Sequence, residues 1–393
     1  MKLRLTSFII LSALLLSACG ESDTYVVPGP PPQDETKPQD PPTPDPPKPD
    51  EPEEPAIDSI LVTNPYMDKY LEEVHYPEND WSYSLILNYP GGGPGEADIP
   101  PTVTLTWPEG ASGELALHLT EGDDEWTRDY SLAAGTTSLD VSNLVPNKRY
   151  IYIVSQADGK EFARDTFYTK GHLHQIYFTK KVRNGRDLGG WKTHDGKTVK
   201  YRKLFRSGKP SDNYIDAAGR EEALAQGIKA ELILRSDTSS EEKNPPLGPD
   251  VEIFGPGFEY GYSTMLKEEE GAKVKACFEF VVKCLRENKP VLFHCSIGSD
   301  RTGTMSILLL GALGVPEPDI CKDFELSYFA PEDWSMTNGV CNRVRTYKGR
   351  YLDAINFFLS YGRKNFWDNV ESYLLSIGVK EKDLYDFRAL MLQ

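Results

Sequence analysis

Near residue 170 the spacing of hydrophobic residues changes, so the chain on either side of this point needs a different kind of fold. Before it, apolar and polar residues alternate with a period of two, which predicts strands with one buried face. These stretches are 102–107, 113–119, 138–141 and 149–154. After residue 179, short apolar runs alternate with segments of helical spacing, which predicts a mostly parallel sheet flanked by helices. The sequence therefore predicts an all-β sandwich over 57–170 and an α/β domain over 171–393.

One motif narrows the interpretation of the first part. Leu144, Pro146 and Tyr150 have the spacing of the tyrosine corner in fibronectin type III domains. The segment thus resembles that family, which implies an immunoglobulin/fibronectin III-like sandwich. No residues here suit catalysis, since His118 falls within an alternating strand. We expect a spacer or a recognition module.

The first eighteen residues have the pattern of an export signal. Lys2 and Arg4 precede an apolar run over 8–16, which is too short to anchor a protein across a bilayer. The small residues before Cys19 resemble the lipobox of bacterial lipoproteins, which implies cleavage before Cys19 and lipidation of its thiol. The alternative is a plain signal peptide. We therefore expect a protein held at the bacterial cell envelope outside the cytoplasm, on the outer membrane or cell surface.

Residues 19–56 are predicted to form a linker that begins at the lipidated cysteine. Thirteen prolines fall within 28–55, and residues 20–56 carry ten acids and two lysines. This composition cannot bury a core, and its prolines favour an extended polyproline II conformation. We expect a stalk; a docking site for a proline-reading domain is the alternative.

Charge and cysteine content exclude several classes of protein. Proteins that bind nucleic acids usually carry an excess of positive charge, whereas this chain has a net charge of −17. We therefore expect no nucleic-acid partner. Five cysteines follow Cys19 without CxxC spacing, so we predict neither a disulfide scaffold nor a zinc site. His172 and His174 lack a nearby carboxylate pair, and we expect no metal or other cofactor. Cys321 or Cys341 could form a reversible disulfide with Cys295.

The motif that indicates chemistry follows a predicted strand at 290–293 and begins a predicted helix at 302–313. It reads His294-Cys295-Ser296-Ile297-Gly298-Ser299-Asp300-Arg301-Thr302-Gly303. A thiol that faces a helix N-terminus is favoured as a thiolate, and Thr302 can moderate its pKa. The five intervening residues suffice to wrap N–H groups around a tetrahedral anion, and Gly298 permits the sharp path. Because Arg301 can offer a planar fork to two phosphoryl oxygens, the motif predicts phosphoryl transfer through a cysteinyl-phosphate.

This His-Cys-x5-Arg spacing resembles the signature of the cysteine-based phosphatases. Segments 182–190, 204–208 and 233–237 resemble the N-x-R-D-L-G-G, F-R-S-G and D-L-R-S-D segments of the bacterial tyrosine-phosphatase family related to lipid phosphatases. Ile233 replaces the first acid of the last pattern, which leaves that acid's role unassigned. The resemblance implies Cys295 as nucleophile and His294, Thr302 and Arg235 as supports. The implied phosphate binders are Ser296, Ile297, Gly298, Ser299, Asp300 and Arg301.

A general acid is needed for alkyl leaving groups, and the sequence offers two candidates. Asp237 is the candidate by resemblance, and Asp300 competes because it lies inside the signature loop. No W-P-D loop is present, and the nearest segment, 332–334, has its aromatic and acid in reversed order. We expect Arg206 and Arg235 to be structural.

The sequence thus predicts a phosphomonoester hydrolase, most simply a protein-tyrosine or dual-specificity phosphatase acting on a phosphorylated peptide or small phosphomonoester. An inositol-phosphate or phosphoinositide phosphatase is one alternative, and a surface pseudophosphatase that binds phosphorylated ligands is the other. Ser299 stands where phosphoinositide-hydrolysing relatives often carry lysine, which favours phosphotyrosine. Lysines such as Lys203, Lys209 or Lys243 could supply the missing charge.

Overall fold

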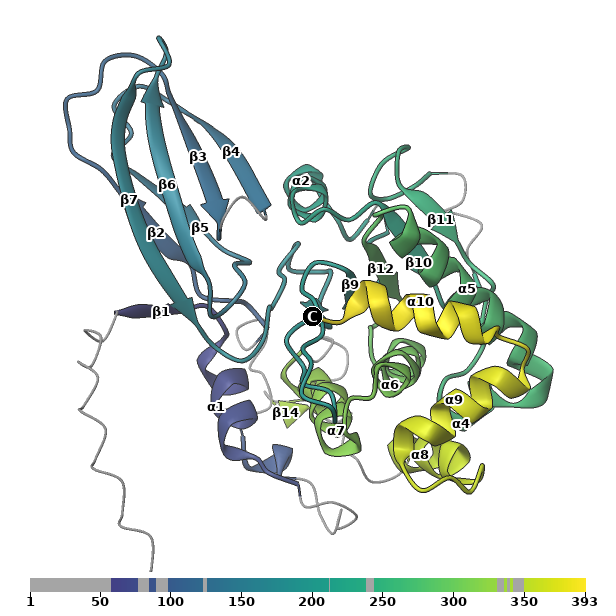
Figure 1. Ribbon diagram of the computed structural model, residues 1–393. Helices are drawn as coiled ribbons and strands as arrows, with labels where there is room; N and C mark the ends of the chain where they lie inside the picture. The colour runs from purple at the N-terminus through teal and green to yellow at the C-terminus, as the bar shows by residue number, and fades with distance from the viewer. Residues whose placement is uncertain are drawn as a thin grey trace, which may run out of the picture. The chain divides into compact units, whose positions relative to one another are not determined.

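The computed structural model describes residues 58–76, 85–89, 98–122, 126–211, 213–237, 244–330, 336–337, 340–341 and 350–393 (Figure 1). The predicted signal peptide, Cys19 and the proline-rich linker lie outside these residues, as do Lys243 and segment 332–334. Among the described residues, none of the helices has the length and apolar character needed to cross a membrane.

The first folded part consists of two sheets that share one core. One sheet has the strand order β1-β7-β6-β3-β4, and the other pairs β2 with β5. The strands are β1 (Ser59–Leu61), β2 (Val103–Thr106), β3 (Leu115–Glu121), β4 (Trp126–Leu132), β5 (Ser138–Val141), β6 (Arg149–Gln156) and β7 (Glu161–Lys170). Their alternating residues, including Leu105, Leu117 and Val154, form a buried cluster. We call β1–β7 the sandwich.

The tyrosine predicted to mark a corner makes a contact of that kind. The backbone N–H of Val145 donates to the Tyr150 hydroxyl at 2.9 Å, and Tyr150 is fully buried. The hydroxyl in turn donates to the Glu121 carboxylate at 2.5 Å. The Tyr150 hydroxyl is therefore satisfied on both sides, as a buried phenol requires. The likeness to a fibronectin type III domain stays a prediction.

A helix that the alternating pattern did not predict lies within the range assigned to the sandwich. Helix α1 (Pro65–Glu73) begins at Asn64, whose side chain accepts from the N–H of Tyr66, and proline occupies its first position. Met67 and Tyr70 enter the core of the α/β domain rather than that of the sandwich. Helix α1 therefore belongs to the sandwich range by its position in the sequence but packs against the α/β domain, because its apolar face contacts the core of that domain.

The α/β domain is built on a five-stranded sheet of order β11-β10-β12-β9-β8. The strands are β8 (Arg186–Asp187), β9 (Leu204–Ser207), β10 (Ala230–Ile233), β11 (Glu252–Phe254) and β12 (Val291–His294). All neighbours are parallel except β8, which runs antiparallel to β9. Successive residues of β12 enter opposite cores: Val291 and Phe293 face the larger one, and Leu292 faces the smaller one. This two-sided burial is what a central parallel strand requires.

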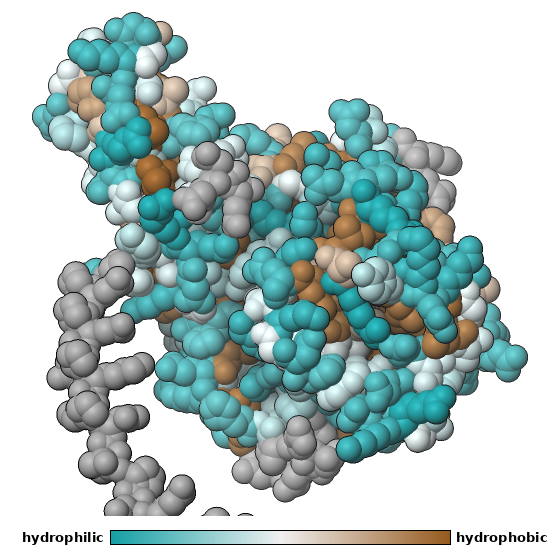
Figure 2. Space-filling model, in the orientation of Figure 1, coloured by the Kyte–Doolittle hydropathy of each residue, from teal (hydrophilic) through white to brown (hydrophobic). Residues whose placement is uncertain are grey.

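Helices cover both faces of this sheet. They are α2 (Ala217–Ala225), α4 (Tyr262–Leu266), α5 (Gly271–Arg286), α6 (Asp300–Leu313), α7 (Glu317–Glu325), α8 (Leu352–Leu359), α9 (Phe366–Ser376) and α10 (Glu381–Met391). Ala223 of α2 lies in the smaller core, and residues of the other helices fill the larger one. Helix α6 is almost entirely buried and ends at Gly314, whose φ of 84° is the left-handed cap that glycine favours. Figure 2 shows a mostly hydrophilic face with hydrophobic residues in separate patches.

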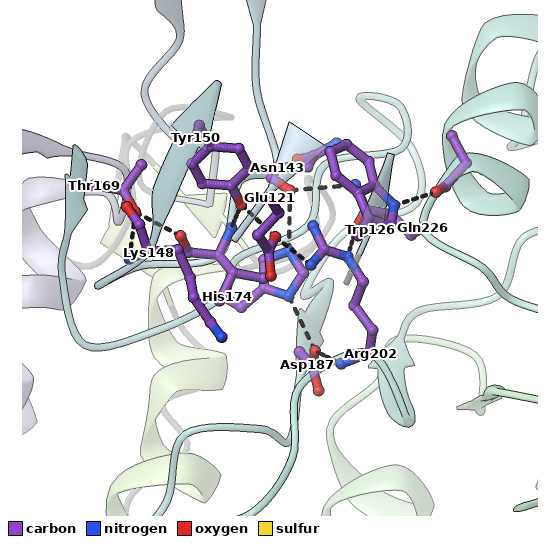
Figure 3. Close-up of polar contacts among 12 residues, drawn as sticks. Glu121, Trp126, Asn143, Lys148, Tyr150, Thr169, His174, Asp187, Arg202 and Gln226 are labelled. Atoms are coloured by element: carbon purple, nitrogen blue, oxygen red, sulfur yellow. Dashed lines mark hydrogen bonds and ion pairs between the residues drawn. The ribbon is translucent and has the colours of Figure 1, made fainter. Parts of the chain in front are cut away.

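The sandwich contacts the α/β domain through a polar network, shown in Figure 3. Arg202 lies over the ring of Trp126 at 4.3 Å and forms an ion pair with Glu121. The Trp126 indole N–H donates to the carbonyl of Ala225, at the end of α2, at 2.7 Å. The buried Glu121 and the half-buried Trp126 of the sandwich thus contact half-buried residues of the α/β domain at this junction.

Candidate active site

The thiol of Cys295 lies where β12 ends and the loop to α6 begins. Cys295 is 1% exposed, and residues 296–299 form the turn before Asp300 starts the helix. Burial by itself raises the pKa of this thiol, but the Thr302 hydroxyl, the charge of Arg301 and the N–H groups of Thr302 and Ile297 lower it more. The pKa of Cys295 therefore lies below its ordinary value, and a thiolate, the nucleophilic form, is favoured.

Gly298 allows the loop to pass against the neighbouring strand. Its φ is 72°, and a Cβ atom here would lie 2.7 Å from the carbonyl carbon of Ser207 at the end of β9. Any larger residue would push the loop away from β9 or change its path. The sequence motif therefore has glycine at this position for two reasons, backbone conformation and close approach.

Arg301 is held from outside its own helix. Its Nη1 donates to the Phe258 carbonyl at 2.9 Å, and its Nη2 lies 3.5 Å from the Ser296 hydroxyl. Phe258 belongs to the loop between β11 and α4, and Gly261 of this loop approaches so closely that a Cβ would lie 2.7 Å from Asp300. The loop thus orients the guanidinium beside the signature loop.

His294 has a buried partner that sequence reasoning missed. Its Nε2 lies 2.7 Å from Oε1 of Glu231 on β10, and its Nδ1 lies 3.2 Å from the Cys295 carbonyl oxygen. Both His294 and Glu231 are fully buried. A carboxylate inside an apolar strand is itself a sequence signal for a buried partner, because burying a charge without one is costly.

A buried polar cluster supports the loop from beneath. Arg206 on β9 donates to the Gly298 carbonyl at 2.7 Å and to Asp323 of α7 at 2.5 Å. Arg186 donates to the other oxygen of Asp323 at 2.8 Å. Asn184 also donates to the Gly298 carbonyl, at 2.9 Å. The N-x-R-D-L-G-G and F-R-S-G segments therefore meet at one carbonyl of the signature loop, and the expected structural role of Arg206 fits this position.

The charges in this cluster influence one another strongly. Burial raises the pKa of the Asp323 carboxyl, but Arg186 and Arg206 together lower it by more than burial raises it. The pKa of Asp323 therefore lies below its usual range. Burial and the neighbouring Arg186 lower the pKa of Arg206 to about 9. One carboxylate thus pairs with two buried guanidinium groups, which makes Asp323 the residue on which this support depends.

Comparison with known proteins decides the family. Residues 178–393 match the family model described as the tyrosine phosphatase family. The chain belongs to this family. A protein of Cupriavidus necator that carries the tyrosine-protein phosphatase name is 25% identical over 233 residues, which is 51% of this chain and 83% of that protein. A tyrosine-protein phosphatase of Nostoc commune is 25% identical over 206 residues, 44% of this chain and 68% of its own length.

Solved structures of low similarity were also found. The P. aeruginosa protein TpbA is 16% identical with a TM-score of 0.29, covering 46% of this chain and 89% of its own. Human DUSP28 is 12% identical with a TM-score of 0.26, covering 44% and 89%. The predicted family and enzyme class are confirmed by the family match and the named relatives: the chain is a tyrosine-phosphatase-like enzyme.

The two candidate acids of this phosphatase lie in different surroundings. Asp237 follows β10, its side chain is 78% exposed, and its carboxylate lies 4.0 Å from Arg235. Asp300 is the first residue of α6, and its carboxylate accepts a hydrogen bond from the Tyr262 hydroxyl at 2.7 Å. The backbone N–H of Leu234 donates to the His294 carbonyl at 2.8 Å, so the segment that leads to Asp237 leaves the sheet beside the signature loop.

The remaining predicted residues lie in or near the loop. Ser299 is 5% exposed, and its carbonyl accepts from Gly303 in the first turn of α6. The Ser296 carbonyl accepts from the N–H of Lys209 at 3.2 Å.

Cys321 is a buried free cysteine, and Cys341 lies in the short strand β14 (Val340–Cys341), of which only the backbone is described. No cluster of potential metal ligands occurs among the residues that the structure describes.

Proposed function

We propose that this enzyme hydrolyses phosphotyrosine esters through a cysteinyl-phosphate intermediate. The observation that carries the proposal is the geometry of the signature loop, which begins at the Cys295 thiol, passes against β9 at Gly298 and brings Arg301 within 3.5 Å of the Ser296 hydroxyl. The N–H groups of this loop also lower the pKa of the thiol. These N–H groups and Arg301 would bind the three equatorial oxygens of the transferred phosphoryl group. The two named relatives support this substrate class.

The reaction would proceed in two displacements. The Cys295 thiolate attacks phosphorus, and the S–P bond forms as the P–O bond of the ester breaks. The leaving oxygen takes a proton from an aspartic acid, for which we propose Asp237, because Asp300 is already engaged by Tyr262. Water then attacks phosphorus, its proton returns to the aspartate, and cleavage of the S–P bond releases phosphate and restores the thiolate.

The predictions for the N-terminal segments belong to the same proposal. A lipid on Cys19, a proline-rich stalk and a fibronectin III-like sandwich would hold the catalytic domain away from a membrane outside the cytoplasm. The proposal rests on the resemblance of residues 1–19 to a lipoprotein signal. The contact between Arg202 and Trp126 supports a sandwich that holds the catalytic domain in a defined orientation.

The decisive test uses the nucleophile. Cys295→Ser should abolish turnover of a phosphotyrosine peptide while phosphate binding persists, because the loop amides and Arg301 remain. Arg301→Lys should also reduce kcat strongly, since an ammonium cannot reproduce the planar fork. In the wild type, kcat/KM should rise with pH through the lowered pKa of Cys295, because only the thiolate attacks. Turnover by the serine variant at the wild-type rate would refute the covalent mechanism.

A further inference from the structure

A cavity lies at the edge of the sheet opposite Cys295. Its volume is about 750 Å³. Residues that immediately precede three parallel strands line it: Lys203 before β9, Lys229 before β10 and Pro290 before β12. Cys295 instead follows β12. Glu121 and Trp126 of the sandwich also line this cavity, so it lies at the junction of the two folded parts.

The lining of this cavity is strongly cationic in a chain whose net charge is −17. Its positively charged residues are Lys148, Lys200, Arg202, Lys203, Lys229 and Arg286, and Glu121 is the one acidic side chain among the described residues that line it. Glu121 pairs with Arg202, and Asp383 and Asp386 neutralise Arg286 from outside the cavity. An excess of positive charge therefore remains on Lys200, Lys203 and Lys229.

Two of these lysines have neutral partners. The Lys200 ammonium donates to the Leu390 carbonyl at 3.1 Å, and the Lys203 ammonium donates to the Asn288 side chain at 3.2 Å. Neither acceptor neutralises a charge. Partial burial lowers the pKa of Lys203, and the nearby charge of Lys200 lowers it further. The two ammonium groups thus lie close enough to repel each other, and an anion between them would remove the repulsion.

Arg202 provides a second, independent indication. Its Nη1 bonds to Glu121 and its Nε to Gln226, but its Nη2 is buried with no hydrogen-bond acceptor among the described residues (Figure 3). A buried guanidinium nitrogen without an acceptor is costly, whereas a phosphate oxygen could satisfy it. The side chain that joins the sandwich to the α/β domain therefore also has one donor left for a ligand in the cavity.

We propose that this cavity, which we call the basic cavity, binds a compact polyanion carrying two or more phosphate groups. Its cations converge from four separate parts of the chain, at Lys148, 200–203, Lys229 and Arg286, on one space. A single negative charge would neutralise only part of this excess, so several charges close together fit it best. The basic cavity is separate from the signature loop, so its ligand acts as a bound partner and is not hydrolysed there.

Tripolyphosphate is a suitable probe, and the signature loop must first be disabled. We would titrate tripolyphosphate at low salt into the chain carrying Cys295→Ser and Arg301→Ala, and measure binding by calorimetry. The expected result is one saturable site whose affinity falls as salt is added. Adding Lys203→Gln or Lys229→Gln should weaken binding at least tenfold. Lys364→Gln, an exposed lysine outside the cavity, is the matched control and should leave affinity unchanged.

Absence of saturable binding in the parent chain would overturn the proposal. Equal weakening by Lys364→Gln would do so too, because it would show unspecific attraction. Hydrogen exchange on the parent chain needs no substitution in the cavity, so it tests the proposal even if a cavity variant fails to fold. Hydrogen exchange of residues 200–203 and 226–229 should slow when tripolyphosphate is added to the parent chain. Unchanged exchange in both segments would contradict binding at this site.

Discussion

Replacing Asp323 by asparagine is expected to destabilise the fold and to slow catalysis at the same time. Its carboxylate accepts from Arg186 at 2.8 Å and from Arg206 at 2.5 Å, and all three side chains are at most 2% exposed. The substitution keeps the size of the side chain but removes the carboxylate charge that pairs with both buried cations. Breaking such a buried pair by removing one partner costs about 3–5 kcal/mol.

Urea unfolding at pH 7 measures this loss. Asp129→Asn is the control, because Asp129 pairs with His118 at the surface with its side chain 82% exposed, and its removal should change stability little. The pH dependence has a definite sign. Since the pKa of Asp323 is lowered in the folded state, its stabilisation is present above the ordinary carboxyl pKa and is lost as pH falls through the lowered value. The two chains should therefore converge only in strong acid.

Catalysis should fall with Asp323 because Arg206 also holds the Gly298 carbonyl at 2.7 Å. A guanidinium that has lost its carboxylate will reorient, and the N–H groups that surround the phosphoryl group will move with the loop. We expect kcat to fall more than tenfold when it is measured without urea, at a pH where the variant is still folded. A variant within about 1 kcal/mol of the wild type would refute the ion-pair argument. Loss of stability with an unchanged kcat would refute the coupling to the loop.

The other predictions concern the acid, the anchor and the substrate. Asp237→Asn should slow hydrolysis of phenyl phosphate far more than that of p-nitrophenyl phosphate, whose oxygen leaves without a proton; the same leaving-group dependence in Asp300→Asn alone would transfer the role to Asp300. Metabolic labelling with a fatty acid should mark the wild type and fail after Cys19→Ala, and an unlabelled wild type would remove the anchor. Ser299→Lys should shift the ratio of kcat/KM from a phosphotyrosine peptide toward a soluble phosphoinositide, and a wild-type preference for the phosphoinositide would reverse the ranking.

Local patterns in the sequence predicted the elements that carry them. The predicted helix at 302–313 corresponds to α6 (Asp300–Leu313). The strand at 290–293 corresponds to β12, shifted by one residue. These elements have periodic apolar residues over their whole length, so the pattern and the packing agree.

Helix α1 was missed for a physical reason. Its apolar residues, including Met67 and Tyr70, have helical spacing, but the segment is short and lies in the range assigned to the sandwich, before the first alternating stretch at 102–107. Its stability comes from contacts that are remote in sequence, since the Tyr70 hydroxyl donates to Glu325 at 2.6 Å across 255 residues. A helix of this length is marginal without tertiary packing, and no local pattern encodes that packing.

Local sequence patterns also indicate only part of the site: the residues of the signature loop, and not the distant residues that support this loop. Cys295 and Arg301 lie within one loop, so their spacing alone indicated their chemistry. Glu231 and Asp323 act on that loop through His294 and Arg206, and each pair is separated by more than sixty residues. What the sequence does contain is the anomaly of a charge inside an apolar element: Glu231 in a buried strand, and Asp323 on the buried side of α7.

Buried charged residues in this domain therefore pair with residues that are distant in the sequence. The charged residues at the two edges of the sheet also differ. At the carboxyl edge, Glu231 contacts His294 through one oxygen and Asp323 accepts from two arginines, although Oε2 of Glu231 and Nε of Arg206 have no hydrogen-bond partner among the described residues. At the amino edge, Arg202 keeps a nitrogen without an acceptor, and Lys203 lies beside another cation. The two edges therefore differ in the sign of their charges: buried carboxylates pair with basic side chains at the first, whereas Lys200 and Lys203 have only neutral hydrogen-bond partners at the second, which is open to an anionic ligand.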